Sequence, residues 1–410
     1  MTTSPRRRAL PFPRRSALPF PNRSALSLLR RSALTVAASV LALTAVVLPV
    51  QTASARSAAG PTRWRVVATI AEHDRAVFLL SVDAVSSSDA WADGIIEPAS
   101  SRLPPVALIE QWNGRSWQRA AVPAKAAATV TADDQFLNSI AASSARNVWA
   151  FSIDGAYLHR SRAGWQPGSI PRRVARSASI ESANVFGPAD VWVFGNGNDT
   201  ATSLTKLTPF AARFNGRRWS AVRMPGRGST GYVSALSRDD MWAITGQGLP
   251  ARRTTGPRVA HWSGRSWRLA ARQPELPAGA QLYSILALSN RDIWVAGEAP
   301  NALGTSPLAE HWNGRVWRVV SPPSRATSAE LALGDLVPDG AGGMWATSTN
   351  LDGTNSSFWH YGSGGWTGVG ARRDWWDAQL AAVPHSTSTW AVTGFLAGRG
   401  LILLHGPVPR

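Results

Sequence analysis

The sequence has 410 residues, with 43 Lys and Arg against 25 Asp and Glu, which gives a formal net charge of +18. This length suits two or three average domains or one large all-β domain, because barrels, sandwiches and propellers often exceed about 200 residues. The absence of Cys excludes a disulfide framework, thiolate metal sites and a cysteine nucleophile. The 20 Trp are far more than an ordinary chain contains, which indicates a structural unit that recurs.

The first 55 residues have the features of an export signal. Residues 6–31 hold eight Arg and no acid, and residues 33–50 are an uncharged run of 18 residues. Ala53-Ser54-Ala55 then supplies the small-x-small pattern that signal peptidase reads, which predicts cleavage after Ala55 and a mature chain over 56–410 with a net charge of +10. A retained membrane anchor is the alternative, because the apolar run can just span a bilayer. Arg30-Arg31 leaves both the Sec and the twin-arginine routes open.

Two columns of Trp recur along the predicted mature chain. The first column follows Asp, Asn or a small polar residue at steps of 43 to 58 residues, and its members are Trp91, Trp149, Trp192, Trp242, Trp294, Trp345 and Trp390. The second column ends hairpin sequences such as Asn113-Gly114-Arg115-Ser116, and its members are Trp117, Trp219, Trp267 and Trp317, with weaker copies at Trp165 and Trp366. A partial third column contains Trp112, Trp262 and Trp312, with Phe214 and Tyr361 as substitutes. The mature chain is therefore a tandem repeat.

Each repeat has the pattern of four short strands. Residues 282–285, 293–296, 308–312 and 317–320 alternate with strand period and are rich in strand-forming residues. Four strands in about 50 residues describe a propeller blade. Since the second Trp column lacks a seventh member and residues 60–67 copy residues 314–320, the strand after Trp64 is expected to complete the last blade. The sequence predicts one all-β domain over 56–410, a seven-bladed β-propeller closed by its N-terminal strand.

The repeat resembles a known family. A glycine-ended strand such as Ile293-Trp294-Val295-Ala296-Gly297, a strand ending at an aromatic residue, and a Trp three residues after a hairpin Gly are similar to the kelch repeat of galactose-oxidase-type propellers. The hairpins with Asn-Gly-Arg-Ser-Trp also resemble the Asp-box turn of sialidase-like propellers, and the Asp-Val-Trp strand resembles tectonin-type lectin repeats. The resemblance covers residues 60–406 and implies a propeller fold.

These resemblances transfer no catalytic residue to this chain. Galactose oxidase needs copper with a Tyr–Cys cross-link, which a chain without Cys cannot form. Sialidases use a Tyr nucleophile with a carboxylate and an arginine triad, but Tyr283 and Tyr361 lie at positions that favour packing, while Tyr232 is less settled. The sequence contains no HExxH, GxSxG or phosphate-binding glycine loop. We expect no cofactor and no catalytic residue, and a carbohydrate-active hydrolase or lyase stays open as an alternative.

The His and Asp residues also fall in columns. Counting six residues back from the second Trp column reaches His159, His261, His311 and His360, with Gln111 and Arg213 at the same place and His405 assigned to it in the last blade. Because repeat-equivalent residues lie one per blade, these side chains are not expected to converge on one metal ion. The Asp column, which contains Asp89, Asp190, Asp240 and Asp292, is interpreted as turn chemistry in which a carboxylate binds backbone N–H groups. The sequence predicts no metal site, although calcium binding to Asp-rich turns stays open.

Function is expected on the face with the variable loops. The connections between second and third strands, among them 298–307, share this face with the inter-blade connections, among them 119–136 and 367–378. The candidate binding residues on these loops are Arg172, Arg173, Arg176, Arg223, Arg227, Arg252, Arg253, Arg258, Arg325, Arg372 and Arg373, with Trp375 and Trp376 as stacking platforms. The alternative for the Arg residues is a solvated basic rim without a ligand. The alternative for Trp375 and Trp376 is a plug that fills the space between the sixth and seventh blades.

The predicted function is that of an exported, monomeric binding propeller. A basic loop face suits an anionic polymer or a glycan outside the cell or at its wall. A platform that docks another extracellular protein is a further alternative, and it requires an apolar patch. No stable membrane insertion is expected after cleavage.

Overall fold

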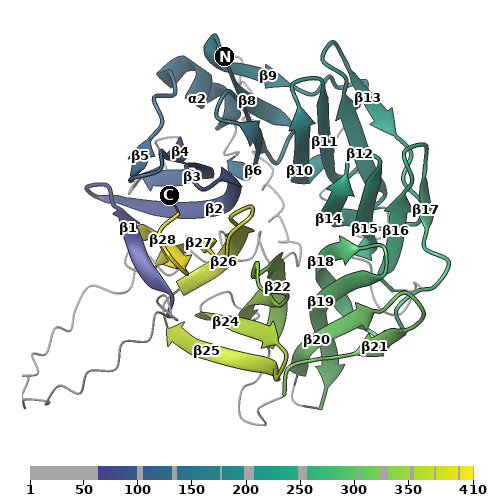
Figure 1. Ribbon diagram of the computed structural model, residues 1–410. Helices are drawn as coiled ribbons and strands as arrows, with labels where there is room; N and C mark the ends of the chain where they lie inside the picture. Colours follow the sequence, from purple (N-terminus) through teal and green to yellow (C-terminus); the bar gives the residue numbers. More distant parts are fainter. Residues whose placement is uncertain are drawn as a thin grey trace, which may run out of the picture.

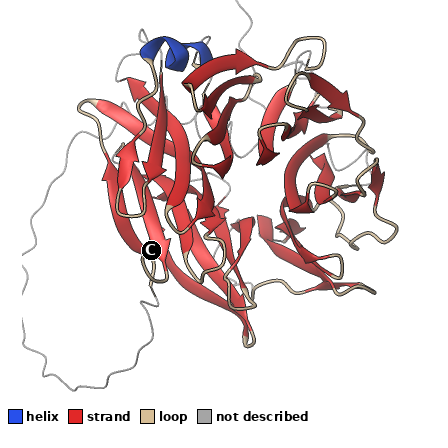
Figure 2. Ribbon diagram, turned by 45° about the horizontal axis from the view of Figure 1, so that its top comes forward, coloured by secondary structure: helices blue, strands red, loops and turns tan. Residues whose placement is uncertain are grey.

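The computed structural model describes residues 63–98, 105–131, 136–175, 178–197, 207–247, 256–302, 304–323, 331–350, 355–373, 375–395 and 398–409. The predicted signal over residues 1–55 and its cleavage site at Ala55 lie outside the described residues. Within the described part, strands make up nearly all of the regular structure, and one short helix, α2 (Ala124–Val130), lies at the edge of the molecule (Figure 2). The predicted all-β class is confirmed.

The described strands form seven four-stranded antiparallel sheets, which are arranged around a common centre as the blades of a propeller (Figure 1). Blade 1 contains β2 (Arg75–Ser86), β3 (Asp89–Pro98), β4 (Val106–Trp112) and β5 (Trp117–Arg119). Blade 2 contains β6 (Leu137–Ser144), β7 (Asn147–Ser152), β8 (Ala156–Ser161) and β9 (Gly164–Ser169). Blade 3 contains β10 (Ser179–Gly187), β11 (Asp190–Asn196), β12 (Pro209–Phe214) and β13 (Trp219–Val222).

The next three blades repeat this order. Blade 4 contains β14 (Ser229–Ser237), β15 (Asp240–Gln247), β16 (Arg258–Trp262) and β17 (Trp267–Leu269). Blade 5 contains β18 (Gln281–Ser289), β19 (Asp292–Asn301), β20 (Gly304–Trp312) and β21 (Trp317–Val319). Blade 6 contains β22 (Leu331–Pro338), β23 (Met344–Asn350), β24 (Asn355–Gly362) and β25 (Gly365–Arg373).

Blade 7 joins the two ends of the described chain. Its strands are β26 (Trp375–Ala382), β27 (Thr389–Phe395), β28 (Arg399–His405) and, as the outer strand, β1 (Arg65–Ile70). β1 pairs antiparallel with β28, and Figure 1 shows this N-terminal strand beside the C-terminal sheet. The predicted seven-bladed ring, closed by the N-terminal strand, is confirmed.

The core lies between neighbouring blades. Each first-column Trp stands on the second strand of its blade, and Trp91, Trp192 and Trp390 have no exposed surface. Trp390 and Val392 of blade 7, for example, pack with Ala90 and Ala92 of blade 1 in a single cluster. Since an aromatic side chain of this size contributes a large apolar area, the Trp columns supply much of the energy that holds adjacent blades together.

Hydrogen bonds also link successive innermost strands. Asp83 of β2 accepts the backbone N–H of Ala142 in β6 at 2.7 Å. Asp335 of β22 accepts the N–H of Leu380 in β26 at 3.0 Å. A side chain of one blade thereby satisfies a backbone donor of the next, so that the inner strands do not leave these donors unpaired.

Three predicted loops are partly regular structure. α2 occupies the middle of residues 119–136, where its Ala126, Ala127 and Val130 are buried. β19 and β20 extend through most of 298–307, and β25 and β26 through almost all of 367–378. Short helices and strand ends depend on tertiary packing, so the sequence of one repeat predicts their boundaries poorly.

Candidate functional site

The strand order places the variable connections on one face of the ring. In each antiparallel blade the link from second to third strand and the link to the next blade leave from the same end of the strands. The first-to-second and third-to-fourth turns leave from the other end, where hairpins such as Asn313-Gly314-Arg315 are short. We call the first set the loop face and the second set the hairpin face.

Four of the predicted basic residues lie exposed on the loop face. Arg172 and Arg173 belong to the β9–β10 connection, and Arg223 and Arg227 belong to the β13–β14 connection. These are successive inter-blade connections. None of the four guanidinium groups forms an ion pair or hydrogen bond with another described residue. Their charges are therefore open to a ligand.

A fifth basic residue stands at the root of a loop. Arg258 begins β16, at the loop-face end of the strand, and its side chain is half-buried. Its Nε is buried and has no hydrogen-bond partner among the described residues. A buried N–H without a partner is costly, so this donor favours an acceptor at that position.

The structure brings these five residues to one face, but the other candidates are less defined. Arg176, Arg252, Arg253 and Arg325 lie outside the described residues. Arg372 and Arg373 end β25, and Trp376 is the second residue of β26; only their backbone is described. Trp375 begins β26, so it stands in the innermost strand of blade 7 and not in a loop.

The indole of Trp375 is packed between blades. It is only 8% exposed and belongs to the cluster between blades 6 and 7. Its ring centroid lies 6.0 Å from that of Phe358, at an interplanar angle of 61°. A ring in this position contributes to packing and offers little surface on which a sugar or base could stack.

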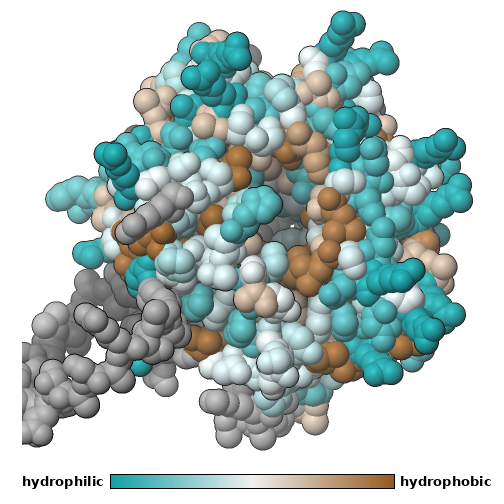
Figure 3. All heavy atoms as spheres, in the orientation of Figure 1, coloured by the Kyte–Doolittle hydropathy of each residue, from teal (hydrophilic) through white to brown (hydrophobic). Residues whose placement is uncertain are grey.

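Figure 3 shows one face of the ring, on which hydrophilic residues dominate the rim and hydrophobic residues gather around the centre. Two exposed apolar side chains take matching positions in adjacent blades. Leu236 near the end of β14 is 36% exposed, and Leu288 near the end of β18 is 38% exposed. Both stand one residue before the end of an innermost strand, at its hairpin-face end. This apolar surface is small, but its position is relevant to the docking alternative.

The predicted His and Asp columns meet within blades 4 and 5, and in blade 6 the column His meets another Asp. Asp292 accepts a hydrogen bond from the Trp294 indole at 3.0 Å and lies 2.8 Å from His311 Nε2. The imidazole of His311 stacks on Trp294 with 4.2 Å between ring centroids. The His261–Asp240 pair of blade 4 and the His360–Asp339 pair of blade 6 repeat the contact at 2.8 and 2.7 Å. In blade 5 the Asp and His side chains thus hold the first-column Trp in place by a hydrogen bond and by stacking.

This arrangement corrects the turn-chemistry interpretation of the Asp column. The carboxylates bind indole, imidazole or guanidinium groups, as Arg213 shows by donating to Asp190 at 2.7 Å. Asp339, which is the partner of His360 in blade 6 but lies six residues before Trp345, does accept the backbone N–H groups of Ala341 and Gly343. Burial acts to raise the pKa of Asp339, but the bonds from His360 and those two N–H groups outweigh it, and the pKa is lowered.

The assignment of His405 is also corrected. Trp149, Trp242, Trp294 and Trp345 pair in register with His159, His261, His311 and His360, whereas Trp390 pairs with Leu404. His405 pairs with Thr389, which is the place of the third, aromatic column. Among the described residues, no group of three or more His, Asp or Glu side chains is placed to hold a metal ion.

One buried pair has the residue types of acid–base chemistry. The Tyr283 hydroxyl of β18 donates to Glu298 Oε1 of β19 at 2.8 Å, and Glu298 is 8% exposed. Burial, followed by the negative charge of Glu298 and their hydrogen bond, raises the pKa of Tyr283. The pair is the described feature most relevant to the enzymatic alternative.

Comparisons with known proteins identify the architecture. No family model matches the sequence, and no curated protein matches it. Among solved structures, the chain is similar to YCF48 bound to a D1 peptide, with a TM-score of 0.53 and 12% identity over 84% of this chain and 97% of the other. YCF48 from Cyanidioschyzon merolae gives a TM-score of 0.51 and 14% identity over 84% and 99%. The fucose-binding lectin of Aleuria aurantia, a six-bladed propeller, gives 0.45 and 11% identity over 75% and 98%.

The two YCF48 likenesses show the fold alone. At such identities the residues of a binding site cannot be carried from one propeller to another. The kelch-like resemblance of the repeat stays a prediction, and function has to be argued from this chain's own side chains.

Proposed function

We propose that this protein is a binding propeller that takes an anionic polymer or an acidic glycan on its loop face, without catalysis of its own. The observation that carries the proposal is the group of exposed, unpaired guanidinium groups of Arg172, Arg173, Arg223 and Arg227 on successive inter-blade connections. A planar guanidinium binds carboxylate, sulfate or phosphate oxygens with two N–H groups, and several together bind a polyanion with release of its counterions.

A polymer suits this surface better than a small ligand. The four side chains belong to two connections, and each is exposed. Individual contacts between exposed charges are weak in water, so useful affinity requires several of them on one chain. The half-buried Arg258 adds a donor that lacks a partner among the described residues.

We further propose that the protein acts outside the cell or at the cell wall, as a monomer. The support is the export signal predicted over residues 1–55, with a mature chain that begins at Arg56. Within the described residues, no helix has the length and apolar character needed to cross a membrane.

The test compares two variants that lose the same charge. The first replaces Arg172, Arg173, Arg223 and Arg227 with Ser, and the control replaces the exposed hairpin-face residues Arg115, Arg217, Arg265 and Arg315 with Ser. Binding to heparin, used as a model polyanion, is measured at about 50 mM salt, where such contacts are strong. We expect the first variant to bind roughly tenfold or more weakly and the control to bind nearly as the parent does. Equal losses of heparin affinity in the two variants would show that binding depends on the net charge of the protein and not on the loop face.

The enzymatic alternative rests on the Tyr283–Glu298 pair. A carbohydrate-active hydrolase or lyase would use such a pair in proton transfer or nucleophilic attack. Incubation with acidic oligosaccharides tests it: product that disappears in Tyr283→Phe, with folding intact, would favour the enzyme over the binding protein.

The docking alternative rests on Leu236 and Leu288. These exposed side chains lie at the hairpin-face ends of adjacent innermost strands. If a protein partner binds there, the double variant Leu236→Ser/Leu288→Ser should lose this binding. The loop-face substitutions should leave it unchanged.

A further inference from the structure

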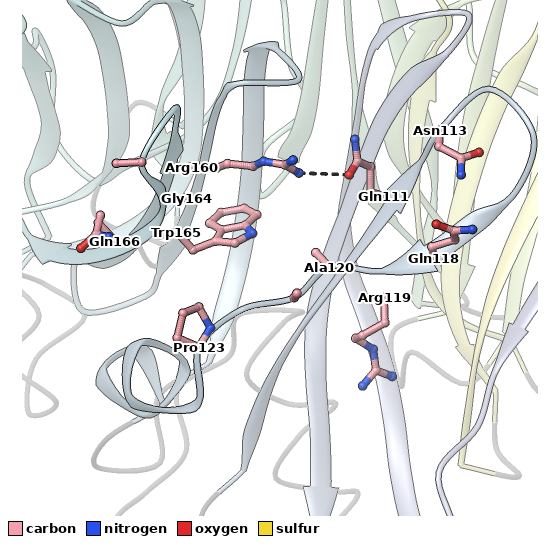
Figure 4. A pocket seen from close by; sticks show the side chains of 12 residues that line it. Gln111, Asn113, Gln118, Arg119, Ala120, Pro123, Arg160, Gly164, Trp165 and Gln166 are labelled. Atoms are coloured by element: carbon pink, nitrogen blue, oxygen red, sulfur yellow. Dashed lines mark hydrogen bonds between the residues drawn. The ribbon is translucent and has the colours of Figure 1, made fainter.

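A cavity of about 370 Å³ lies between blades 1 and 2 (Figure 4). Its walls come from β4, β5 and the residues that follow β5 on one side, and from β8, the β8–β9 turn and β9 on the other. This volume is near the lower end of the range for small-molecule pockets, which suits one or two sugar units.

The cavity coincides with a break in the third column. Each member of this column lies on the third strand of its blade. It pairs with the second-strand residue that comes directly before the first-column Trp. Six of the blades have an aromatic or imidazole ring there, namely Trp112, Phe214, Trp262, Trp312, Tyr361 and His405. Blade 2 has Arg160, paired with Val148.

The substitution changes what covers the Trp of the preceding blade. Trp112 lies 5.0 Å from Trp390, and Tyr361 lies 4.7 Å from Trp294, between ring centroids. Between blades 1 and 2 the guanidinium carbon of Arg160 lies over Trp91, 4.8 Å from its ring centroid. A cation–π contact thus replaces an aromatic pair, and a charged group takes the place of a ring.

Arg160 keeps donors for a ligand. Its Nη1 donates to Gln111 Oε1 at 3.0 Å, as Figure 4 shows. It forms no ion pair with another described residue, and none of the residues lining the cavity is acidic. Arg119, which also lines the cavity, is already paired with Glu110 at 2.8 Å and with Glu72 at 2.9 Å. Arg160 is therefore the cavity-lining guanidinium without an ion pair. The carboxylate of Asp89, which does not line the cavity, acts on it electrostatically.

The other polar lining consists of amides. Gln118 and Gln166 line opposite sides of the cavity, and their amide groups can both donate and accept hydrogen bonds. Sugar hydroxyls have the same dual capacity. The indole of Trp165 also lines the cavity, but it is only 6% exposed and packs on Trp91, so it closes the cavity against the core between the blades.

We infer that this inter-blade cavity binds a small sugar that carries an anionic group, held by the Arg160 guanidinium and the Gln118 and Gln166 amides. The anion is a carboxylate or a phosphate, since a guanidinium binds both bidentately. The site is distinct from the loop-face arginines, because none of Arg172, Arg173, Arg223 and Arg227 lines it.

The experiment is titration calorimetry with three sugars on the mature protein. Methyl glucuronide carries a carboxylate, glucose 6-phosphate carries a phosphate, and methyl glucoside is the neutral control. The decisive variant is Arg160→Phe, which installs the ring that the equivalent position has in blade 3 and so is expected to keep the fold. Arg160→Gln removes the charge at smaller volume change, and Arg265→Gln on an exposed hairpin is its matched control.

We expect at least one anionic sugar to bind roughly tenfold or more tightly than the neutral one, since a hydrogen-bonded ion pair is worth that much. Which anion binds better identifies the charged group. Arg160→Phe and Arg160→Gln should lose this preference, while Arg265→Gln and the loop-face variant should retain it. Equal binding of all three sugars, no binding of any, or unchanged binding in both Arg160 variants would overturn the inference. Gln166→Ala, which leaves the charge in place, should weaken binding of all sugars about equally.

Discussion

Closure of the ring by its N-terminal strand can be tested at Trp64, which immediately precedes β1. The indole of Trp64 stacks on Phe358, with 4.1 Å between ring centroids and 19° between planes. It also meets Trp345 edge-on at 5.3 Å. Trp64 therefore connects the outer strand of blade 7 with the core between blades 6 and 7.

The expected cost of Trp64→Ala follows from these contacts. Truncation of a buried Trp costs about 3 to 5 kcal/mol, and Trp64 is half-buried, which places it at the low end. Two aromatic pairs contribute about 0.5 to 1.5 kcal/mol each to that total. Its indole N–H has no hydrogen-bond partner among the described residues, so no such bond is lost. We expect a loss of about 3 kcal/mol, which lowers the melting temperature by roughly 5 °C.

Thermal unfolding followed by near-ultraviolet circular dichroism measures this loss. Trp317→Ala is the matched control, because Trp317 is a half-buried outer-strand Trp of blade 5 that contacts Trp312 at 5.8 Å. Val66→Ala on β1, where Val66 is 47% exposed, should change the stability by less than about 0.5 kcal/mol. An unchanged melting temperature in Trp64→Ala, beside a clear loss in Trp317→Ala, would refute the closure of blade 7 by β1.

Three further predictions concern burial, packing and processing. Burial raises the pKa of Asp83 from 3.8 to about 6, against the bond from the Ala142 N–H. Because the folded state then binds a proton more tightly than the unfolded state, stability falls as pH rises from about 4 to about 6. In denaturant titrations, the unfolding free energy of Asp83→Asn relative to the parent should rise by about 1 to 2 kcal/mol across that window, because the partial exposure of Asp83 reduces the full effect of its shift. A difference in unfolding free energy that does not change with pH would contradict the prediction. Trp375→Ala should cost about 3 to 5 kcal/mol in thermal unfolding while heparin affinity of the folded protein stays unchanged; lost affinity with unchanged stability would make Trp375 a ligand contact. N-terminal sequencing of exported protein should start at Arg56, whereas Met1 on a membrane-bound form would establish a retained anchor.

The repeat made most of the fold predictable from sequence. Since every blade needs a Trp on its second strand to fill the space against its neighbour, the first Trp column counts the blades directly. Because the outer strands also repeat, the likeness of residues 60–67 to 314–320 located the closing strand. α2 was missed because Ala124–Val130 has no counterpart in the other described connections, so no column reveals it.

The site was less predictable, because it depends on where the repeats differ. His405 was assigned to the wrong column because the last blade takes its outer Trp from the other end of the chain, and counting back from that Trp is impossible there. Trp375 was placed in a loop because β25 and β26 follow each other with almost no connection. Arg160 was missed, although the signal was present: the place five residues before Trp165 lacks the aromatic residue found in the other repeats.

The salt dependence of polyanion binding tests the central claim most directly. The affinity of the mature protein for heparin is measured between about 50 and 200 mM salt, for the parent and for the variant with Ser at positions 172, 173, 223 and 227. Each arginine that displaces counterions contributes about 0.7 to 0.9 to the slope of log affinity against log salt, so the four substitutions should reduce the slope by about 3. A parent whose affinity does not change with salt, or a variant with the parent's slope, would contradict the binding of anionic polymers on the loop face.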